Sequence, residues 1–211
     1  MNREEFFDKW SELHGGAAIK GIVKWWLTIS FAISRPLVRI SPSLITTSAL
    51  LFAGLYLYWI STPIAIVFLV LTLLVDGIDG TVALLSGKVS KNGAVLDAVI
   101  DRLVEAAWAY GLFLIGAPWE LVMVAWLAAF VQEYMRARAA GLGQSEVGVV
   151  TICERPIRAT LIFIGLVAIG VGIADQEVIA KVCAGLWSAM QVIALITLFF
   201  SLRARLHRSR S

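Results

Sequence analysis

Four aspartates between residues 76 and 101 could share one chemical site. Asp76 and Asp79 are three residues apart, and Asp97 and Asp101 are four apart, so each pair lies on one face of a predicted helix. A carboxylate at the centre of a membrane-spanning helix costs about 2.5–3.5 kcal/mol on insertion scales. Four of them in otherwise apolar helices indicate a functional site with a compensating partner.

A short loop brings the two pairs to one depth. Residues 87–92 connect the two predicted helices, and Ser90 or Asn92 is suited to cap the second. The helices are therefore antiparallel neighbours. At 1.5 Å per residue, both pairs lie roughly 6–16 Å below the loop, so the four carboxylates can meet.

Such a group suits hard divalent cations. Four neighbouring carboxylates cannot all stay ionised without cations, and oxygen ligands favour Mg²⁺, Mn²⁺ or Ca²⁺ when no His or Cys is near. Two divalent ions stabilise both the attacking and the leaving oxygen in phosphoryl transfer. Small residues in the same stretch would let a diphosphate approach the backbone: Gly77, Gly80, Ala83 and Gly93. We expect two divalent ions, Mg²⁺ or Mn²⁺.

The rest of the chain is apolar enough to hold these helices in a membrane. Of 211 residues, 59% are hydrophobic and 16% are charged, whereas about a quarter are charged in a soluble domain. Apolar runs of about 20 residues predict six spans. They cover residues 43–60, 63–86, 93–115, 118–140, 156–174 and 177–202. The predicted fold class is an all-α, polytopic integral membrane protein.

Residues 1–40 are predicted to lie at the membrane surface. Residues 1–16 resemble a polar, partly amphipathic helix, and no cleavable signal peptide is expected. Residues 17–40 predict an interfacial helix, with Lys20 and Lys24 on one face and Trp25 and Trp26 at the headgroup level. A seventh span is the alternative for this stretch. The chain is thus divided into an N-terminal segment, 1–40, and a six-helix transmembrane domain, 41–211.

The positive charges orient these spans. Of 18 Lys and Arg residues, only Lys181 lies on the side opposite the two termini. The positive-inside rule therefore predicts cytoplasmic termini, a cytoplasmic site and a multi-pass protein of the plasma membrane. The two cysteines, Cys153 and Cys183, suit apolar packing better than a disulfide or a metal cluster.

The aspartate stretch resembles the signature of the CDP-alcohol phosphatidyltransferase family, D-x-x-D-G-x-x-A-R-x8-G-x-x-x-D-x-x-x-D. Every spacing fits, and the one departure is Leu84 in place of the family's arginine. The six-span bundle with an N-terminal surface helix is also similar to that family. The resemblance implies transfer of a phosphatidyl group from CDP-diacylglycerol to an alcohol, with release of CMP, in phospholipid biosynthesis.

The resemblance also implies residue roles. Asp76, Asp79, Asp97 and Asp101 would be metal ligands, and Asp101 is the candidate general base on the acceptor hydroxyl. The donor CDP-lipid would contact residues of the same stretch together with one threonine: Thr46, Asp76, Gly80, Ala83 and Gly93.

The acceptor is expected near a cluster of arginines. Residues 134–143 and 154–158 resemble the actinobacterial phosphatidylinositol-phosphate synthase branch of the family, which implies that Arg136, Arg138 and Arg155 hold the acceptor phosphate. The sixth predicted span has Gln191 and no arginine at mid-length, so glycerol phosphate stays open beside inositol phosphate. The family further implies a homodimer, and no nucleic-acid partner is expected.

Two other functions remain open from the sequence. An ion-coupled transporter would also place acids in a membrane, although all four acids lie in one half of it. A family member with impaired activity would follow if the loss of the arginine at Leu84 is not compensated.

Overall fold

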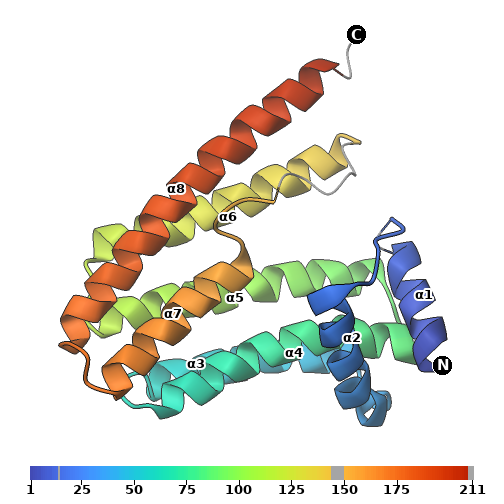
Figure 1. Ribbon diagram of the computed structural model, residues 1–211, viewed down its shortest axis with the longest axis horizontal. Coiled ribbons are helices and arrows are strands. Elements are labelled where there is room, and N and C mark those ends of the chain that lie inside the picture. The colour runs from blue at the N-terminus through green and yellow to red at the C-terminus, as the bar shows by residue number, and fades with distance from the viewer. Residues whose placement is uncertain (14, 144–149, 209–211) are drawn as a thin grey trace. The chain divides into compact units, whose positions relative to one another are not determined.

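The computed structural model describes residues 1–13, 15–143 and 150–208, and within these residues the chain is helical with no strand. Figure 1 shows the helices in chain order. They are α1 (Arg3–Leu13), α2 (Gly21–Ser34), the 3-10 helix η1 (Arg35–Leu37), α3 (Pro42–Tyr58), α4 (Ile64–Ser86), α5 (Lys91–Leu114), α6 (Trp119–Gly141), α7 (Arg155–Gly170) and α8 (Gln176–Arg208). The predicted all-α class is confirmed.

The chain forms two compact units. Unit 1 consists of Met1–Ala53 and Val70–Val104, and unit 2 consists of Gly54–Leu69 and Glu105–Ser211. Helices α3, α4 and α5 each contribute residues to both units. The four aspartates belong to unit 1, and the candidate acceptor arginines belong to unit 2.

In unit 1, an apolar cluster joins α1 and α2 to the end of α4. Its buried members are Phe6, Leu27 and Leu84, and five partly buried side chains pack around them: Phe7, Trp10, Ile19, Phe31 and Leu85. The rings of Phe6 and Phe31 lie 5.4 Å apart. Leu84, the departure from the family motif, is 8% exposed and belongs to this cluster.

Small side chains let α2 approach α4 closely. Ser30 Oγ donates to the carbonyl oxygen of Gly77 at 3.2 Å and lies 2.6 Å from Thr81 Oγ1. A Cβ at Gly77 would collide with the Trp26 ring. Gly77 is therefore small because Trp26 packs against it. Trp25, in contrast, is exposed.

In unit 2, α8 packs along α6 and also along α7. Three alanines of α8, Ala180, Ala184 and Ala194, are fully buried, and such small residues allow close helix packing. Ser188 Oγ of α8 donates to the carbonyl oxygen of Leu121 in α6 at 2.7 Å.

Two of the described helices, α4 and residues Gln176–Arg205 of α8, are long and apolar enough to cross a membrane. The segments Val23–Leu37 and Pro42–Tyr58 meet the same criterion only together, across a bend of 106°. Helices α3 and α7 have only 17 and 16 residues, whereas α5 and α6 carry charges. The structure therefore supports a membrane protein with at least two spans and does not by itself establish six.

Helix α2 alone is shorter than the hydrocarbon core. It has 14 residues, about 21 Å at 1.5 Å per residue, and the core is about 30 Å thick. Residues Val23–Leu37 meet the criterion for a span only together with α3, so the seventh span stays an alternative for this stretch.

The outward surfaces of the helices are apolar. Large hydrophobic side chains are exposed along α4, α6 and α8, for example Val67, Leu127 and Ile193. Soluble monomers rarely expose apolar patches on this scale. These surfaces suit contact with lipid.

Candidate active site

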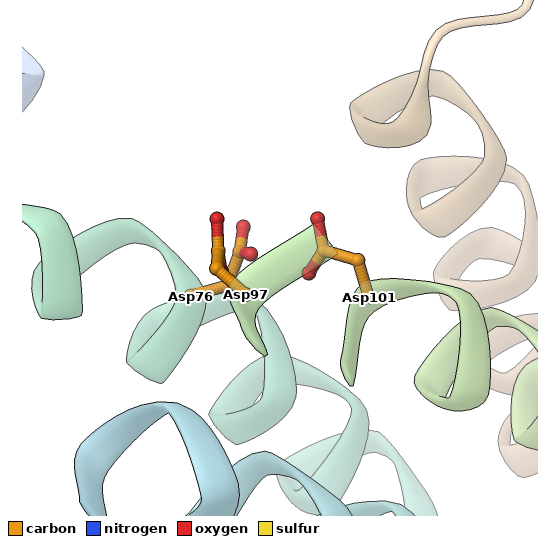
Figure 2. A group of neighbouring side chains, drawn as sticks. All are labelled: Asp76, Asp97 and Asp101. Atoms are coloured by element: carbon orange, nitrogen blue, oxygen red, sulfur yellow. The ribbon is translucent and has the colours of Figure 1, made fainter. Parts of the chain in front are cut away.

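Three of the four aspartates meet in one cluster. Carboxylate oxygens of Asp76, Asp97 and Asp101 all lie within 4.8 Å of one another. Asp76 comes from α4, and Asp97 and Asp101 come from successive turns of α5 (Figure 2). All three side chains are half-buried, so a ligand can reach them.

The turn between α4 and α5 determines how Asp97 and Asp101 are placed relative to Asp76. Helix α4 ends at Ser86 and is followed by Gly87, whose φ of 68° is readily adopted only by glycine. The Lys88 N–H then donates to the carbonyl oxygen of Ala83 at 2.9 Å. Ser90 caps α5, because its Oγ accepts from the Gly93 N–H at 3.0 Å. The predicted cap is thus Ser90, and with this cap Asp97 and Asp101 face Asp76 across the two helices.

Asp79 has a different environment from the other three carboxylates. Thr46 Oγ1 donates to its Oδ2 at 2.6 Å, and the Gly80 N–H donates to its Oδ1 at 2.5 Å. The side chain is buried, with 6% exposed. The sequence predicted four carboxylates in one group, whereas the described structure groups three and holds the fourth against α3.

A cavity of about 660 Å³ opens beside these carboxylates. Its walls include Asp76, Asp79 and Asp97. All five residues predicted to contact the donor also line it: Thr46, Asp76, Gly80, Ala83 and Gly93. Nothing lies within 4 Å of a Cβ built on Gly80, so this part of the wall is open.

The residues fit a divalent metal of the hard class. The three clustered side chains offer only carboxylate oxygens, the ligands that Mg²⁺ and Mn²⁺ prefer. The carboxylate oxygens of Asp76, Asp97 and Asp101 are the ones grouped closely enough to share an ion. The carboxylate of Asp79 instead accepts hydrogen bonds from the Thr46 hydroxyl and the Gly80 N–H.

The predicted acceptor arginines lie in three environments in unit 2. Arg136 pairs with Glu154, with its two terminal nitrogens 2.8 and 2.6 Å from the carboxylate oxygens, and with Glu133 at 3.2 Å. Arg155 lies 3.9 Å from Glu105 and stacks over Trp108 with its guanidinium carbon 5.4 Å from the ring centroid. Arg138 is exposed near the end of α6.

Glu154 is held firmly in its ionised form. Burial raises the pKa of its carboxyl, but hydrogen bonds from Arg136 and Thr151 outweigh burial and lower that pKa from 4.5 to about 2. Thr151 donates to the Oε1 atom of Glu154 from its N–H at 2.6 Å and from its hydroxyl at 2.8 Å. Glu154 thus ties the loop before α7 to α6 through Arg136.

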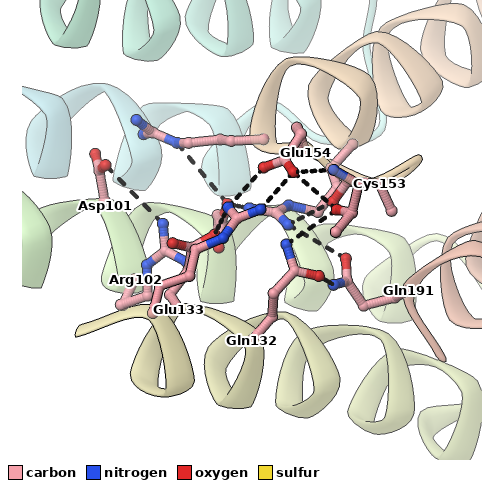
Figure 3. Close-up of polar contacts among 12 residues, drawn as sticks. Asp101, Arg102, Gln132, Glu133, Cys153, Glu154 and Gln191 are labelled. Carbon is pink, nitrogen blue, oxygen red and sulfur yellow. Dashed lines mark hydrogen bonds and ion pairs between the residues drawn. The ribbon is translucent and has the colours of Figure 1, made fainter. Parts of the chain in front are cut away.

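Unit 2 also holds a buried polar network, whose contacts are drawn in Figure 3 and whose connections the sequence did not predict. Arg158 is fully buried and donates to Glu105 at 2.5 Å, to the carbonyl oxygen of Cys153 at 2.8 Å and to Gln191 at 3.2 Å. Gln191 in turn donates to Gln132 Oε1 at 2.7 Å. The network joins α5, α6, α7 and α8. Its sequence signals were polar and charged residues inside predicted spans, namely Glu105, Arg158 and Gln191.

The cysteines are structural, as predicted. Cys153 and Cys183 are both free and buried. Burial raises the pKa of the Cys153 thiol to about 11, so the thiol stays protonated and unreactive at neutral pH.

Comparison with known proteins extends this picture to most of the chain. The profile of the CDP-alcohol phosphatidyltransferase family matches residues 39–203. The archaetidylinositol phosphate synthase of Pyrococcus horikoshii is 33% identical over 147 residues, which cover 63% of this chain and 77% of that protein. The phosphatidylinositol phosphate synthase of Corynebacterium glutamicum is 35% identical over 149 residues, which cover 64% of this chain and 67% of that protein.

Solved structures share the fold. The crystal structure of Mycobacterium tuberculosis phosphatidylinositol phosphate synthase with CDP-DAG bound has a TM-score of 0.64 at 24% identity, covering 83% of this chain and 94% of that one. A structure of the same enzyme in complex with manganese and citrate has a TM-score of 0.66 at 23% identity, covering 82% and 88%. With the aspartate motif complete except at Leu84, the profile match shows that this chain belongs to the CDP-alcohol phosphatidyltransferase family and is a transferase of that family.

Proposed function

We propose that this protein transfers a phosphatidyl group from CDP-diacylglycerol to a phosphorylated polyol, with inositol phosphate the first candidate, and releases CMP. The observation that carries the proposal is the grouping of Asp76, Asp97 and Asp101 beside a cavity lined by the residues of the family motif. In the reaction, an acceptor hydroxyl oxygen bonds to the phosphorus that carries diacylglycerol. The bond from that phosphorus to CMP then breaks, and CMP keeps the bridging oxygen.

The aspartates would hold two divalent cations, Mg²⁺ or Mn²⁺. Bound there, the cations would neutralise the diphosphate and stabilise the attacking and leaving oxygens. Support comes from the all-carboxylate character of the cluster and from the structurally similar mycobacterial enzyme, which is known in complex with manganese. Asp79 of α4, whose carboxylate is hydrogen-bonded by Thr46 of α3, would complete the ligand set.

Asp101 is the proposed general base. It is one helical turn beyond Asp97 on α5 and half-buried. A base role requires that it be less tightly coordinated than its neighbours, because a bound cation lowers a carboxylate pKa. In that state Asp101 accepts the proton of the acceptor hydroxyl as the new phosphorus–oxygen bond forms.

Arg155 and Arg138 are the proposed acceptor-phosphate ligands, with Arg136 as a third. A guanidinium fork suits phosphate because it gives two charge-assisted hydrogen bonds. The names of two relatives, an archaetidylinositol phosphate synthase and a phosphatidylinositol phosphate synthase, support a phosphorylated inositol as acceptor. Arg136 is paired with Glu154 and Glu133, and Arg155 lies near Glu105 and the Trp108 ring, so either would share its charge with these partners, whereas Arg138 is exposed.

We further propose six spans, with α1 and α2 at the cytoplasmic surface and both termini inside the cell. The support is the charge distribution, in which 17 of 18 Lys and Arg residues fall on the side of the termini. The site would then open to the cytoplasm, where water-soluble acceptors are available. A homodimer in the plasma membrane is the proposed assembly, on the basis of family resemblance.

The test uses purified protein in lipid nanodiscs with CDP-diacylglycerol and Mn²⁺. Inositol phosphate, glycerol phosphate, inositol and glycerol are supplied in separate reactions. CMP is measured, and the product lipid is identified by mass. The expected result is metal-dependent CMP release with inositol phosphate and a lipid of the corresponding mass. Glycerol phosphate as the sole productive acceptor would correct the acceptor, and no CMP with any alcohol would refute the proposed function.

A further inference from the structure

The donor cavity contains a cation that the family motif does not specify. Its described lining includes the carboxylates of Asp76, Asp79 and Asp97, whereas Lys88 is its only described lysine or arginine. The other lining side chains are neutral. Among the described lining residues, Lys88 is therefore the one cationic side chain that a dianionic nucleotide diphosphate in this cavity could contact.

The turn after α4 places Lys88 at the cavity wall. Gly87 adopts a φ of 68°, and the N–H groups of Gly87 and Lys88 donate back to the carbonyl oxygens of Leu84 and Ala83 at 3.3 and 2.9 Å. This pair of hydrogen bonds is the glycine-ended helix cap that reverses the chain. Lys88 follows this reversal, outside the helix, and its side chain is exposed. It lines the cavity together with Ser90 and Gly93.

Leu84, at the same end of α4, packs in the apolar cluster of unit 1. It is buried in the apolar cluster with Phe6 and Leu27, and it also forms part of the cavity wall. The same wall includes Trp10 of α1 and Trp26 of α2. A charged side chain at position 84 would have to leave this cluster or carry its charge into it, which is costly. Position 84 therefore suits an apolar residue, and the cation in the described cavity wall is that of Lys88.

We infer that Lys88 is a donor-binding residue, whose ammonium contacts the diphosphate of the CDP-lipid, while Leu84 holds α1 and α2 over the cavity. This inference rests on the proposed function for the identity of the donor. Lysine suits the role because its ammonium is a compact point charge with three donors and binds phosphate without a fixed approach direction.

The test compares three variants in nanodiscs with Mn²⁺: Lys88→Met, Lys88→Arg and Lys91→Met. Lys91 is the matched control, since it is an exposed lysine at the start of α5, three residues from Lys88, and does not belong to the cavity wall described. CDP, a soluble part of the donor, is titrated calorimetrically, and CMP release is measured over a range of CDP-diacylglycerol concentrations. A thermal melt of each variant confirms that it is folded.

The expected result is a loss of CDP affinity on the order of 10–100-fold in Lys88→Met, the size of one charge-assisted hydrogen bond. The KM for CDP-diacylglycerol should rise with kcat less affected, Lys88→Arg should keep most of the affinity, and Lys91→Met should bind as the wild type does. Unchanged CDP affinity in Lys88→Met, an equal loss in Lys91→Met, or a wild type that does not bind CDP would overturn the inference.

The two proposals fail separately. If the wild type binds CDP but releases no CMP with any alcohol, the proposed function is wrong. The CDP titrations of the three variants then still decide the role of Lys88.

Discussion

At the scale of single residues, the motif aspartates are not equivalent. Asp76, Asp97 and Asp101 are half-buried and grouped with oxygens within 4.8 Å, whereas Asp79 is buried and receives hydrogen bonds from Thr46 and from the Gly80 N–H. The first three are therefore arranged to share a ligand. Asp79 is arranged to be held in one orientation.

The hydroxyl of Thr46 is expected to fix Asp79. Thr46→Val keeps the side-chain shape but removes the donor, leaving a buried carboxylate oxygen without this hydrogen bond at a cost of about 1–3 kcal/mol. We expect a lower melting temperature and slower CMP release, both largely restored in Thr46→Ser. Thr47→Val is the control, because Thr47 is exposed and donates only to the Ser43 carbonyl oxygen of its own helix. Equal effects at positions 46 and 47 would contradict this role.

The pairing of Glu154 with Arg136 predicts a pH-dependent contribution to stability. The folded pKa of Glu154, about 2, lies below its usual value of 4.5. The stabilisation is therefore fully present above pH 4.5 and is lost as the pH falls towards 2. Glu154→Gln should melt at a lower temperature than the wild type at neutral pH, and the two melting temperatures should converge on acidification. Glu120→Gln, at an exposed carboxyl of α6, should show no such convergence. A constant difference at all pH values would count against the pairing.

At the scale of helices, the ion pair between Glu105 of α5 and Arg158 of α7 is the main buried polar tie described in unit 2. Both side chains are 0% exposed. Removing one partner of such a pair typically costs about 3–5 kcal/mol, because it leaves the other charge buried. Arg158→Met should therefore lower the melting temperature strongly, and the double variant Glu105→Leu/Arg158→Met should recover part of the loss. Lys181→Met, which breaks the exposed pair with Glu177, is the control and should have little effect. A double variant less stable than Arg158→Met would refute the argument.

The helices themselves were largely predictable from the sequence, and their tertiary partners were not. The ends of α4 follow from an apolar run bounded by Pro63 and Gly87, and the facing of Asp76 towards Asp97 follows from helical spacing across a short loop. The hydrogen bond from Thr46 to Asp79 joins residues that are 33 positions apart in the sequence. The ion pair of Arg158 with Glu105 joins residues that are 53 positions apart. No local pattern encodes such pairings. The packing of Trp26 on Gly77 was missed for the same reason, since the sequence placed both tryptophans of α2 at the headgroup level.

At the scale of the whole molecule, the sequence and the structure agree on an all-helical membrane protein with apolar outward surfaces. The predicted number of spans rests on the apolar runs, and their predicted direction rests on charge. Loops rich in lysine and arginine stay on the cytoplasmic side because their transfer across the membrane is disfavoured. The loop between α4 and α5, with Lys88 and Lys91, should therefore face the cytoplasm, and Asp175 should face the opposite side.

Thiol labelling in sealed cells tests this orientation. The native cysteines are first removed as Cys153→Ala and Cys183→Ala, and Lys91→Cys and Asp175→Cys are introduced separately. A membrane-impermeant maleimide should label Asp175→Cys in intact cells and Lys91→Cys only after permeabilisation. The reverse pattern would invert the topology, and labelling of both in intact cells would refute the six-span arrangement.

The central claim, a metal-dependent phosphatidyl transfer carried out by the grouped aspartates, is tested most directly by CMP release from CDP-diacylglycerol. The wild type, Asp97→Asn and Asp175→Asn are compared in nanodiscs with Mn²⁺ and inositol phosphate. Asn keeps the shape of the side chain but removes the charge that a divalent cation needs. We predict that the wild type and Asp175→Asn release CMP, that chelation of the metal stops this release, and that Asp97→Asn reduces it to background. CMP release by Asp97→Asn at the wild-type rate would contradict the account.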